Sequence, residues 1–260
     1  MRMTKASPCL PALLALSTSL RSARTAEGLG LRRLAHKLGV PAQALSLWET
    51  GKRAPAIEDV AHVLGFLRVS PEEYDRIMRL RRQLENPISI ETLDAGSTSQ
   101  RRALEELAVR TFEWAPQVVP EQLQTPHYIQ AIAQGHAAGP DDLDQVVFEH
   151  QVRQLDQGWT GHRIVLVGAA ALAPAIDPQL QAFRAAANVP GLVVKIVPPS
   201  VAKAIDPFTI YEGQGKVFTV ALRHQDNIIF VSEPDAVQGY RSTFKALERG
   251  SVTCADFRFP

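Results

Sequence analysis

Apolar residues recur at helical spacing throughout the first third of the chain. The five segments that carry this pattern lie at 12–27, 31–39, 40–51, 56–67 and from 71 onward. Gly39 and Gly51 stand where helices end, and Ser70 with Glu73 forms the pattern of a capping box before the fifth segment. The pattern therefore predicts five short helices within residues 1–85.

The remainder of the chain alternates between short apolar runs and helical patterns. Five runs are typical of strands, at 162–168, 192–198, 207–213, 216–222 and 227–233. Helical patterns lie near 100–113, 126–137, 141–157, 177–188 and 235–249. A helical segment separates the first two strand runs, which indicates a parallel pair, whereas short turns separate the last three, which indicates an antiparallel meander.

Residues 86–99 have weak periodicity and many turn-forming residues, so they are predicted to be a linker. This gives three parts: a helix-turn-helix domain at 1–85, the linker, and a regulatory, dimerisation or partner-binding domain at 100–260. The fold class expected is multidomain. An all-α N-terminal bundle precedes an α/β (α+β) domain whose mixed sheet is flanked by helices.

The helix expected over residues 41–50 has two different faces. Leu45 and Trp48 share the inward face, where they can pack against the preceding helix. The outward positions are Ala42, Gln43, Ser46 and Leu47. Two short helices joined by a glycine turn, the second with a polar outward face, predict a helix-turn-helix whose second helix enters the major groove of double-stranded DNA.

Basic residues lie on both sides of this predicted recognition helix. They are Arg32, Arg33, Lys52 and Arg53, and their positions suit contacts with DNA phosphates. Residues 1–85 carry 14 Lys/Arg and 8 Asp/Glu, a net charge of +6, while residues 86–260 carry 14 and 19, a net charge of −5. This asymmetry favours a polyanion as partner of the first part. The alternative is an ordinary helical bundle with a basic surface.

Composition excludes several other classes of protein. Hydrophobic residues make up 45% and charged residues 21%, as in globular proteins with a core, and no apolar stretch approaches the roughly 20 residues that span a bilayer. Cys9 and Cys254 provide neither a disulfide framework nor a metal-binding spacing, which favours the cytoplasm. The basic and apolar start of the chain has some likeness to a signal peptide, but the helical spacing of its leucines favours a helix of the folded domain.

The segment LRRLAHKLGVPAQALSLWETGKRAP resembles the helix-turn-helix of XRE-family regulators, the lambda-repressor and Cro group. The matching positions are Leu34, Ala35, Leu38, Gly39, Val40, Leu45, Ser46, Glu49, Gly51, Arg53 and Pro55. Leu31 stands where the family usually has glutamine, and Pro41 replaces its usual capping Ser or Thr. The resemblance implies sequence-specific DNA binding.

Most of residues 105–250 resembles the C-terminal domain of actinobacterial Scr-type regulators, which are described as antitoxin-like. The best motif is VP-GLLQT-xxY, matched by Pro120, Leu123, Gln124, Thr125 and Tyr128. Members of this family are often encoded beside a small acidic protein, so the resemblance implies such a partner.

Catalytic and cofactor-binding patterns are lacking in the sequence. There is no H-E-x-x-H pair, no G-x-S-x-G elbow and no phosphate-binding loop, so neither enzyme activity, a metal site nor a cofactor is predicted. The most distinctive stretch of the second half is WAPQVVPEQLQTPHY. Its Trp114, Gln124, Thr125 and Tyr128 are candidates for a partner or ligand surface. The favoured interpretation is that Trp114 and Tyr128 are core residues and that Pro120 and Pro126 break the chain before a helix.

These patterns favour a cytoplasmic, homodimeric transcriptional regulator, because pairing over two half-sites raises affinity and specificity. One alternative is an antitoxin-like module that acts mainly through its small acidic partner protein. Another is an enzyme gated by DNA binding, against which the missing catalytic residues count.

Overall fold

The computed structural model describes residues 10–92, 100–135, 161–173, 176–186, 189–202, 205–213, 217–224 and 227–258. The chain divides into two compact units. Unit 1 comprises residues 1–107 with 223–236, and unit 2 comprises 108–222 with 237–260. The helix expected over 141–157 lies outside the described residues.

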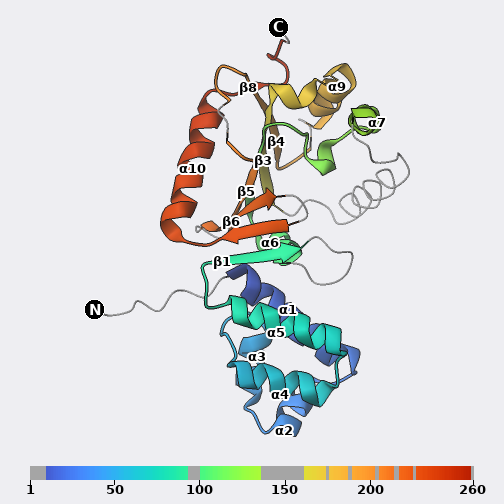
Figure 1. Cartoon of the computed structure of the whole chain (residues 1–260), viewed down its shortest axis with the longest axis vertical. Coiled ribbons are helices and arrows are strands. Elements are labelled where there is room, and N and C mark those ends of the chain that lie inside the picture. Colours follow the sequence, from blue (N-terminus) through green and yellow to red (C-terminus); the bar gives the residue numbers. More distant parts are fainter. Residues whose placement is uncertain are drawn as a thin grey trace. The chain divides into compact units, whose positions relative to one another are not determined.

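Unit 1 begins with a bundle of five helices, as the apolar spacing predicts (Figure 1). These are α1 (Leu10–Ala26), α2 (Leu31–Leu38), α3 (Ala42–Glu49), α4 (Ile57–Leu67) and α5 (Pro71–Gln83). The leucines that repeat along the first segment, among them Leu13, Leu16 and Leu20, are buried in one apolar core with side chains of the other four helices. Burial of this stripe is the main stabilising contribution to a helix of this kind.

Local sequence explains where the helices begin and end. Gly39 has φ +68°, and its N–H donates to the carbonyls of Ala35 and His36 at the end of α2. Because a side chain disfavours this left-handed conformation, glycine is the suitable residue there. Ser70 Oγ accepts a hydrogen bond of 3.2 Å from the Glu73 N–H, which is one half of the predicted capping box.

Unit 1 also contains a two-stranded ladder and a sixth helix. Strand β1 (Ile88–Thr92) pairs antiparallel with β7 (Asn227–Val231), and α6 (Gln100–Leu107) packs against α1. Ser89 Oγ donates to Gln100 Oε1 at 2.7 Å, which connects β1 to α6. Strand β1 lies within the predicted linker 86–99, so that part of the linker is regular structure.

Unit 2 contains a mixed sheet with the strand order β6-β5-β2-β3-β4-β8. The strands are β2 (Arg110–Ala115), β3 (His162–Gly168), β4 (Leu192–Val197), β5 (Phe208–Glu212), β6 (Val217–His224) and β8 (Val252–Thr253). The pairs β2–β3 and β3–β4 are parallel, whereas β2–β5, β5–β6 and β4–β8 are antiparallel. The predicted parallel pair, β3 with β4, is confirmed.

The helix expected near 100–113 is too long, because α6 ends at Leu107 and β2 begins at Arg110. Phe112 and Trp114 alternate with polar residues along β2, which is the pattern of a half-buried strand. Strands β3 and β5 both pair with β2. Their hydrogen bonds stabilise the extended conformation of residues 110–115, over which the helix of the preceding segment was expected to continue.

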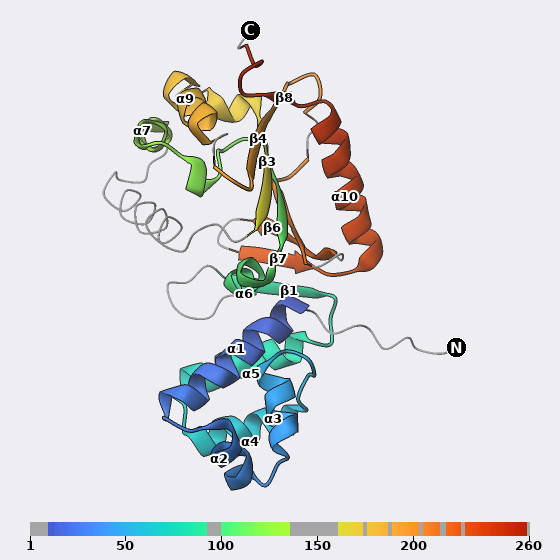
Figure 2. The same ribbon diagram turned by 180° about the vertical axis from the view of Figure 1, so that it is seen from behind.

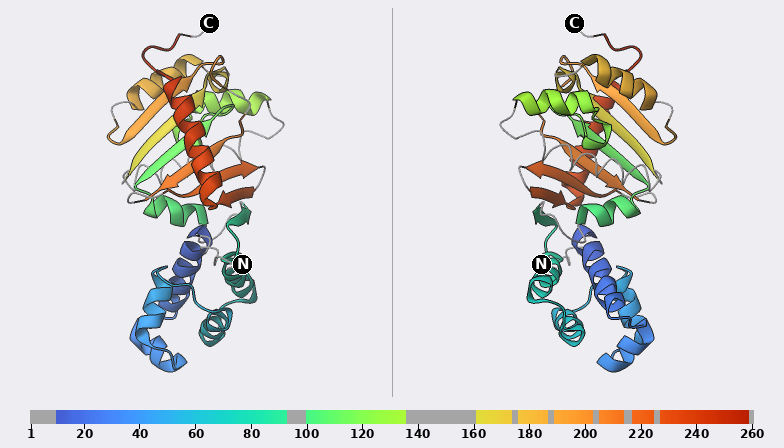
Figure 3. Two further views of the ribbon diagram at one scale, coloured as in Figure 1. Left: turned by 90° about the vertical axis from the view of Figure 1, so that its left-hand side faces the viewer. Right: turned by 90° about the vertical axis from the view of Figure 1, so that its right-hand side faces the viewer.

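Helices cover both faces of this sheet (Figures 1 and 2). Helix α10 (Pro234–Arg249) runs across one face, where a core cluster includes Trp114, Leu166, Phe208 and Phe244 (Figure 3). Helices α7 (Pro126–Gly135) and α9 (Ile176–Ala186), with the short turns η1 (Glu121–Leu123) and η2 (Ala169–Leu172), lie on the other face around a second cluster. The predicted fold class, a helical bundle followed by a mixed sheet flanked by helices, is confirmed.

Candidate nucleic-acid interface

Helices α2 and α3 are joined by a tight turn of three residues. After Gly39, the Val40 N–H donates to the Ala35 carbonyl at 3.0 Å, which closes α2. The Pro41 carbonyl accepts from the N–H groups of Ala44 and Leu45, at 2.9 and 3.2 Å, which begins α3. The arrangement is a helix-turn-helix whose turn geometry is set by backbone hydrogen bonds.

The orientation of α3 is determined by its buried face. Leu45 is fully buried and Trp48 nearly so, in the same apolar core as Leu34 and Leu38 of α2. Rotating α3 about its axis would expose these two large side chains to water, which is strongly unfavourable. The opposite side of the helix is therefore held outward.

The four outward positions predicted from the sequence differ in exposure. Gln43 is exposed, while Ala42, Ser46 and Leu47 are half-buried, and Ala42 packs against the core of the bundle. Gln43 is thus the most solvent-accessible of the four side chains on this face of α3. Leu47 is the large apolar side chain among the four, and it is half-buried.

The four basic residues predicted to flank α3 are all exposed in unit 1. Gly51, with φ +67°, turns the chain after α3, and the N–H groups of Lys52 and Arg53 both donate to the Leu47 carbonyl, at 3.0 and 3.2 Å. These two bonds fold the segment back onto the end of α3. Lys52 and Arg53 therefore lie directly beside the helix on a fixed backbone.

A buried ion pair that the sequence analysis did not identify connects α3 to α1. Arg24 Nε and Nη2 donate to the two carboxylate oxygens of Glu49, each at 2.7 Å, and Arg24 Nη1 donates to the Leu29 carbonyl. The two residues are only 9% and 6% exposed. The hydrogen bond to Glu49 raises the pKa of Arg24, an effect that burial opposes.

This ion pair positions the end of α3. The planar guanidinium meets the carboxylate with two parallel bonds, so both the distance and the orientation of Glu49 are specified. Glu49 could be singled out from the sequence, because it matches the family motif. Its partner Arg24 could not be inferred in the same way, because it lies 25 positions earlier in the chain.

A second arginine fixes the segment that follows α3. Arg81 Nε, on α5, donates to the Pro55 carbonyl at 2.7 Å. This bond connects the segment after Lys52 and Arg53 to the fifth helix. The two basic residues are thus held between α3 on one side and an anchored backbone on the other.

In the segment Trp114–Tyr128 of unit 2, side chains form hydrogen bonds with backbone groups of the same segment. The Val119 N–H donates to Tyr128 Oη at 3.0 Å, and Gln124 Nε2 donates to the Val119 carbonyl at 2.7 Å. Burial raises the pKa of the Tyr128 hydroxyl. Two side chains of the predicted surface therefore satisfy both backbone polar groups, N–H and C=O, of the buried residue Val119.

Gln179, on α9, completes this network, and the sequence analysis did not identify it. Its side chain is fully buried; Oε1 accepts from the Thr125 N–H and hydroxyl, at 3.1 and 3.3 Å, and Nε2 donates to the Leu123 carbonyl. Trp114, Gln124 and Tyr128 are buried and Thr125 is half-buried. This is the arrangement expected of core residues, which is the interpretation that the sequence favoured for Trp114 and Tyr128.

Among the described residues, no three His, Cys, Asp or Glu side chains lie close enough together to hold a metal ion. Cys254 is buried, its Sγ donates to the Val194 carbonyl, and burial raises the pKa of the thiol to about 11, so it is protonated at neutral pH. Within the same described ranges, no helix is both long enough and apolar enough to cross a membrane.

Comparison with known families gives two matches. A family model described as "Domain of unknown function (DUF5753)" matches residues 99–257. A model described as "Helix-turn-helix" matches residues 20–74, which include α2, the turn and α3. None of the curated proteins compared with the chain matches it.

One similar solved structure is that of TrmBL2, an archaeal chromatin protein described as showing a novel mode of DNA binding. It is 13% identical, with 82% of this chain and 71% of that chain covered and a TM-score of 0.36. This likeness is too weak to support a functional inference.

Proposed function

The chain belongs to the DUF5753 family and carries a helix-turn-helix domain, and from this premise we propose that it is a sequence-specific DNA-binding transcriptional regulator. One observation carries the proposal. Leu45 and Trp48 hold α3 so that exposed Gln43 faces outward, with exposed basic residues before and after the helix. A short helix presented in this way is of the size and polarity that enter the major groove.

The outward face of α3 supplies the groups that would read the base sequence. The amide of Gln43 both donates and accepts, so it is suited to an adenine edge. Ser46 can pair with several bases, and Leu47 with a thymine methyl. The exposed charges of Arg32, Arg33, Lys52 and Arg53 would bind phosphates on either side and set the register of α3 on the duplex.

We propose further that residues 100–260 form the part that dimerises the protein in the cytoplasm or responds to a partner or effector. A single helix-turn-helix covers few base pairs, so two-fold pairing would raise affinity and specificity. The division at 86–99 and the antitoxin-like alternative with a small acidic partner rest on sequence and resemblance. They remain predictions.

A binding assay on two duplexes tests the proposed function. Fluorescence anisotropy of the full-length protein would compare a labelled duplex from the region upstream of its own gene with a scrambled duplex of equal composition. The proposal expects tighter binding to the upstream duplex. If both duplexes bind equally at every salt concentration, the protein does not read sequence there. If neither binds until a partner protein is added, the antitoxin-like alternative is favoured.

Replacing Gln43 by alanine is expected to weaken binding to the specific duplex by about 1–3 kcal/mol, which is the contribution of one good bidentate base contact. Binding to the scrambled duplex should hardly change, because phosphate contacts dominate it. The measurement is the ratio of the two dissociation constants. Equal losses on both duplexes would contradict the assignment of Gln43 as a base-reading residue.

Arg53→Ala and Arg33→Ala are expected to lower affinity for both duplexes alike. Each should reduce the slope of log K against log salt concentration by about one unit, because one phosphate contact and its released counterion are lost. Arg79→Ala, which removes the same charge from the exposed face of α5, is the matched control. If the Arg79 variant changes the slope as much, the effect reflects net charge and not a phosphate contact.

A further inference from the structure

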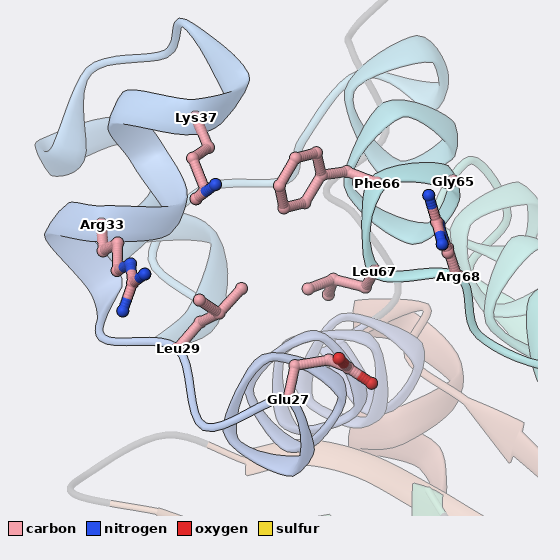
Figure 4. Close-up of a pocket in the computed structure, with 8 residues that line it drawn as sticks. All are labelled: Glu27, Leu29, Arg33, Lys37, Gly65, Phe66, Leu67 and Arg68. Atoms are coloured by element: carbon pink, nitrogen blue, oxygen red, sulfur yellow. The ribbon is translucent and has the colours of Figure 1, made fainter.

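A groove of about 590 Å³ opens on unit 1 between the α1–α2 connection, α2 and the end of α4 (Figure 4). This α2–α4 groove is lined by apolar side chains and by basic ones. The apolar members are Leu29, Phe66 and Leu67, and the basic members are Arg33, Lys37 and Arg68. Its volume lies within the range of about 300–1,000 Å³ that is typical of binding sites.

Phe66 is the largest apolar group of the groove. Its side chain is 38% exposed, although it follows the buried Leu64 on the same helix. Lys37 Nζ lies 5.7 Å from the centroid of the Phe66 ring, within the range of a cation–π contact. Figure 4 shows Phe66 and Leu67 reaching from α4 toward α2, from which Arg33 and Lys37 extend. The groove therefore presents an accessible ring with a cation beside it.

Arg68 has an unfavourable backbone conformation. It caps α4 with φ +52° and ψ +41°, and among the described residues no other non-glycine residue has a positive φ. Glycine is the residue that usually occupies this position at a helix end, because it has no Cβ. An arginine held in this conformation is a candidate for a functional side chain. Its position in the lining of the groove supports that role.

The charges of the groove indicate an anionic occupant. Three basic residues line it, against the single carboxylate of Glu27. A small hydrated anion would leave the exposed Phe66 ring and the half-buried Leu29 unused, and a DNA backbone carries no apolar side chain that could pack on them. An acidic polypeptide with an apolar side chain satisfies both the charged rim and the apolar lining.

We propose that the α2–α4 groove docks an acidic segment of a partner protein. An apolar side chain of that segment packs on Phe66 beside Leu29, above the buried Leu67, and its carboxylates pair with Lys37, Arg68 and Arg33. Arg33 is also one of the residues assigned to DNA phosphates. Docking therefore competes with one phosphate contact and lowers affinity for DNA, a consequence that rests on the proposed function.

A peptide-binding assay tests the groove without DNA. The probe is a short fluorescein-labelled peptide of aspartate and glutamate that contains one leucine and one phenylalanine, and the control peptide has serine at both apolar positions. Fluorescence anisotropy with the full-length protein measures the two dissociation constants. The proposal expects the apolar probe to bind about tenfold more tightly than the serine control, because the buried aromatic anchor supplies much of such an interface.

Two variants locate the binding. Phe66→Ala should weaken probe binding by about tenfold. Arg68→Gly should weaken it by up to about fivefold, as expected for the loss of an exposed ion pair, while its melting temperature stays the same or rises because glycine suits the left-handed conformation. Arg79→Ala removes an equal charge outside the groove and should leave probe affinity unchanged.

Other outcomes overturn the proposal. Equal affinity for the two peptides, or equal losses in the Arg68 and Arg79 variants, would mean attraction to a basic surface without a docking site. Failure of the wild-type protein to bind the probe would also overturn it. If Arg68→Gly and Phe66→Ala instead weaken binding to random duplex DNA as Arg53→Ala does, the groove belongs to the DNA surface. Because the peptide assay contains no DNA, a failure of the proposed function would not alter its result.

Discussion

Replacing Glu49 by alanine is expected to lower the free energy of unfolding of the helical bundle by about 3–5 kcal/mol, the range for removing one partner of a buried ion pair. The variant leaves the guanidinium of Arg24 in an interior position with the Leu29 carbonyl as its remaining bonded neighbour. Burying a charge without its counter-charge is far more unfavourable than losing one hydrogen bond. Urea unfolding followed by circular dichroism at the helical wavelength measures the change.

Two controls separate the uncompensated charge from the loss of packing. The double variant Arg24→Met with Glu49→Leu removes both charges and should recover most of the lost stability, because apolar pairs of similar size often replace buried ion pairs without penalty. Glu58→Ala removes an exposed carboxylate from α4 and should leave the unfolding midpoint nearly unchanged. A Glu49 variant as stable as the Glu58 variant would mean that the ion pair does not hold α3 in place.

The helices of unit 1 could be predicted because their signals are local. Leu45 and Trp48 are three positions apart and therefore share a helix face, and both are buried. Gly39 and Ser70 lie at helix ends, where a single residue accounts for the cap. Such features involve neighbours within about one turn, so the spacing of residue types is sufficient to identify them.

Short strands were harder to predict, because strand formation depends on partners far away in the chain. The stretch that forms β1 is five residues long, and turn-forming residues on both sides favoured a linker. Its partner β7 begins at Asn227, so the pairing cannot be inferred from local spacing. Propensity likewise gave too long a helix before β2, because two neighbouring strands, β3 and β5, stabilise the extended conformation.

The roles of buried polar residues could not be predicted from local sequence either, because their partners lie far away in the chain. Gln179 has an ordinary position in an amphipathic helix, and only the fold brings it to Thr125 and Leu123, more than 50 positions earlier. The distinctive motif around Gln124 and Tyr128 could be recognised, but not that these two side chains satisfy the N–H and the carbonyl of Val119. A motif of unusual residue types therefore indicates that its residues have a specific role. It does not show whether that role is packing within the fold or binding to a partner.

Trp114 allows these two kinds of constraint to be separated by experiment. The side chain is 1% exposed, packs in the cluster with Leu166, Phe208 and Phe244, and its Nε1–H donates to the Ile205 carbonyl at 3.2 Å. Trp114→Ala is expected to lower the free energy of unfolding by about 3–5 kcal/mol, since it removes a large buried ring and leaves a cavity beneath α10. Chemical denaturation of the full-length protein measures this change.

Trp114→Phe is the matched variant, because it keeps an aromatic ring in the same space and gives up the hydrogen bond to Ile205. It should lose clearly less stability than the alanine variant, since most of the buried apolar area is retained. A partner-binding role at the surface predicts the reverse: unchanged stability in Trp114→Ala, with self-association or partner binding reduced in analytical ultracentrifugation. Because the ring is enclosed between the sheet and α10, we expect unfolding to respond to its removal, and any change in association to follow from that loss of stability.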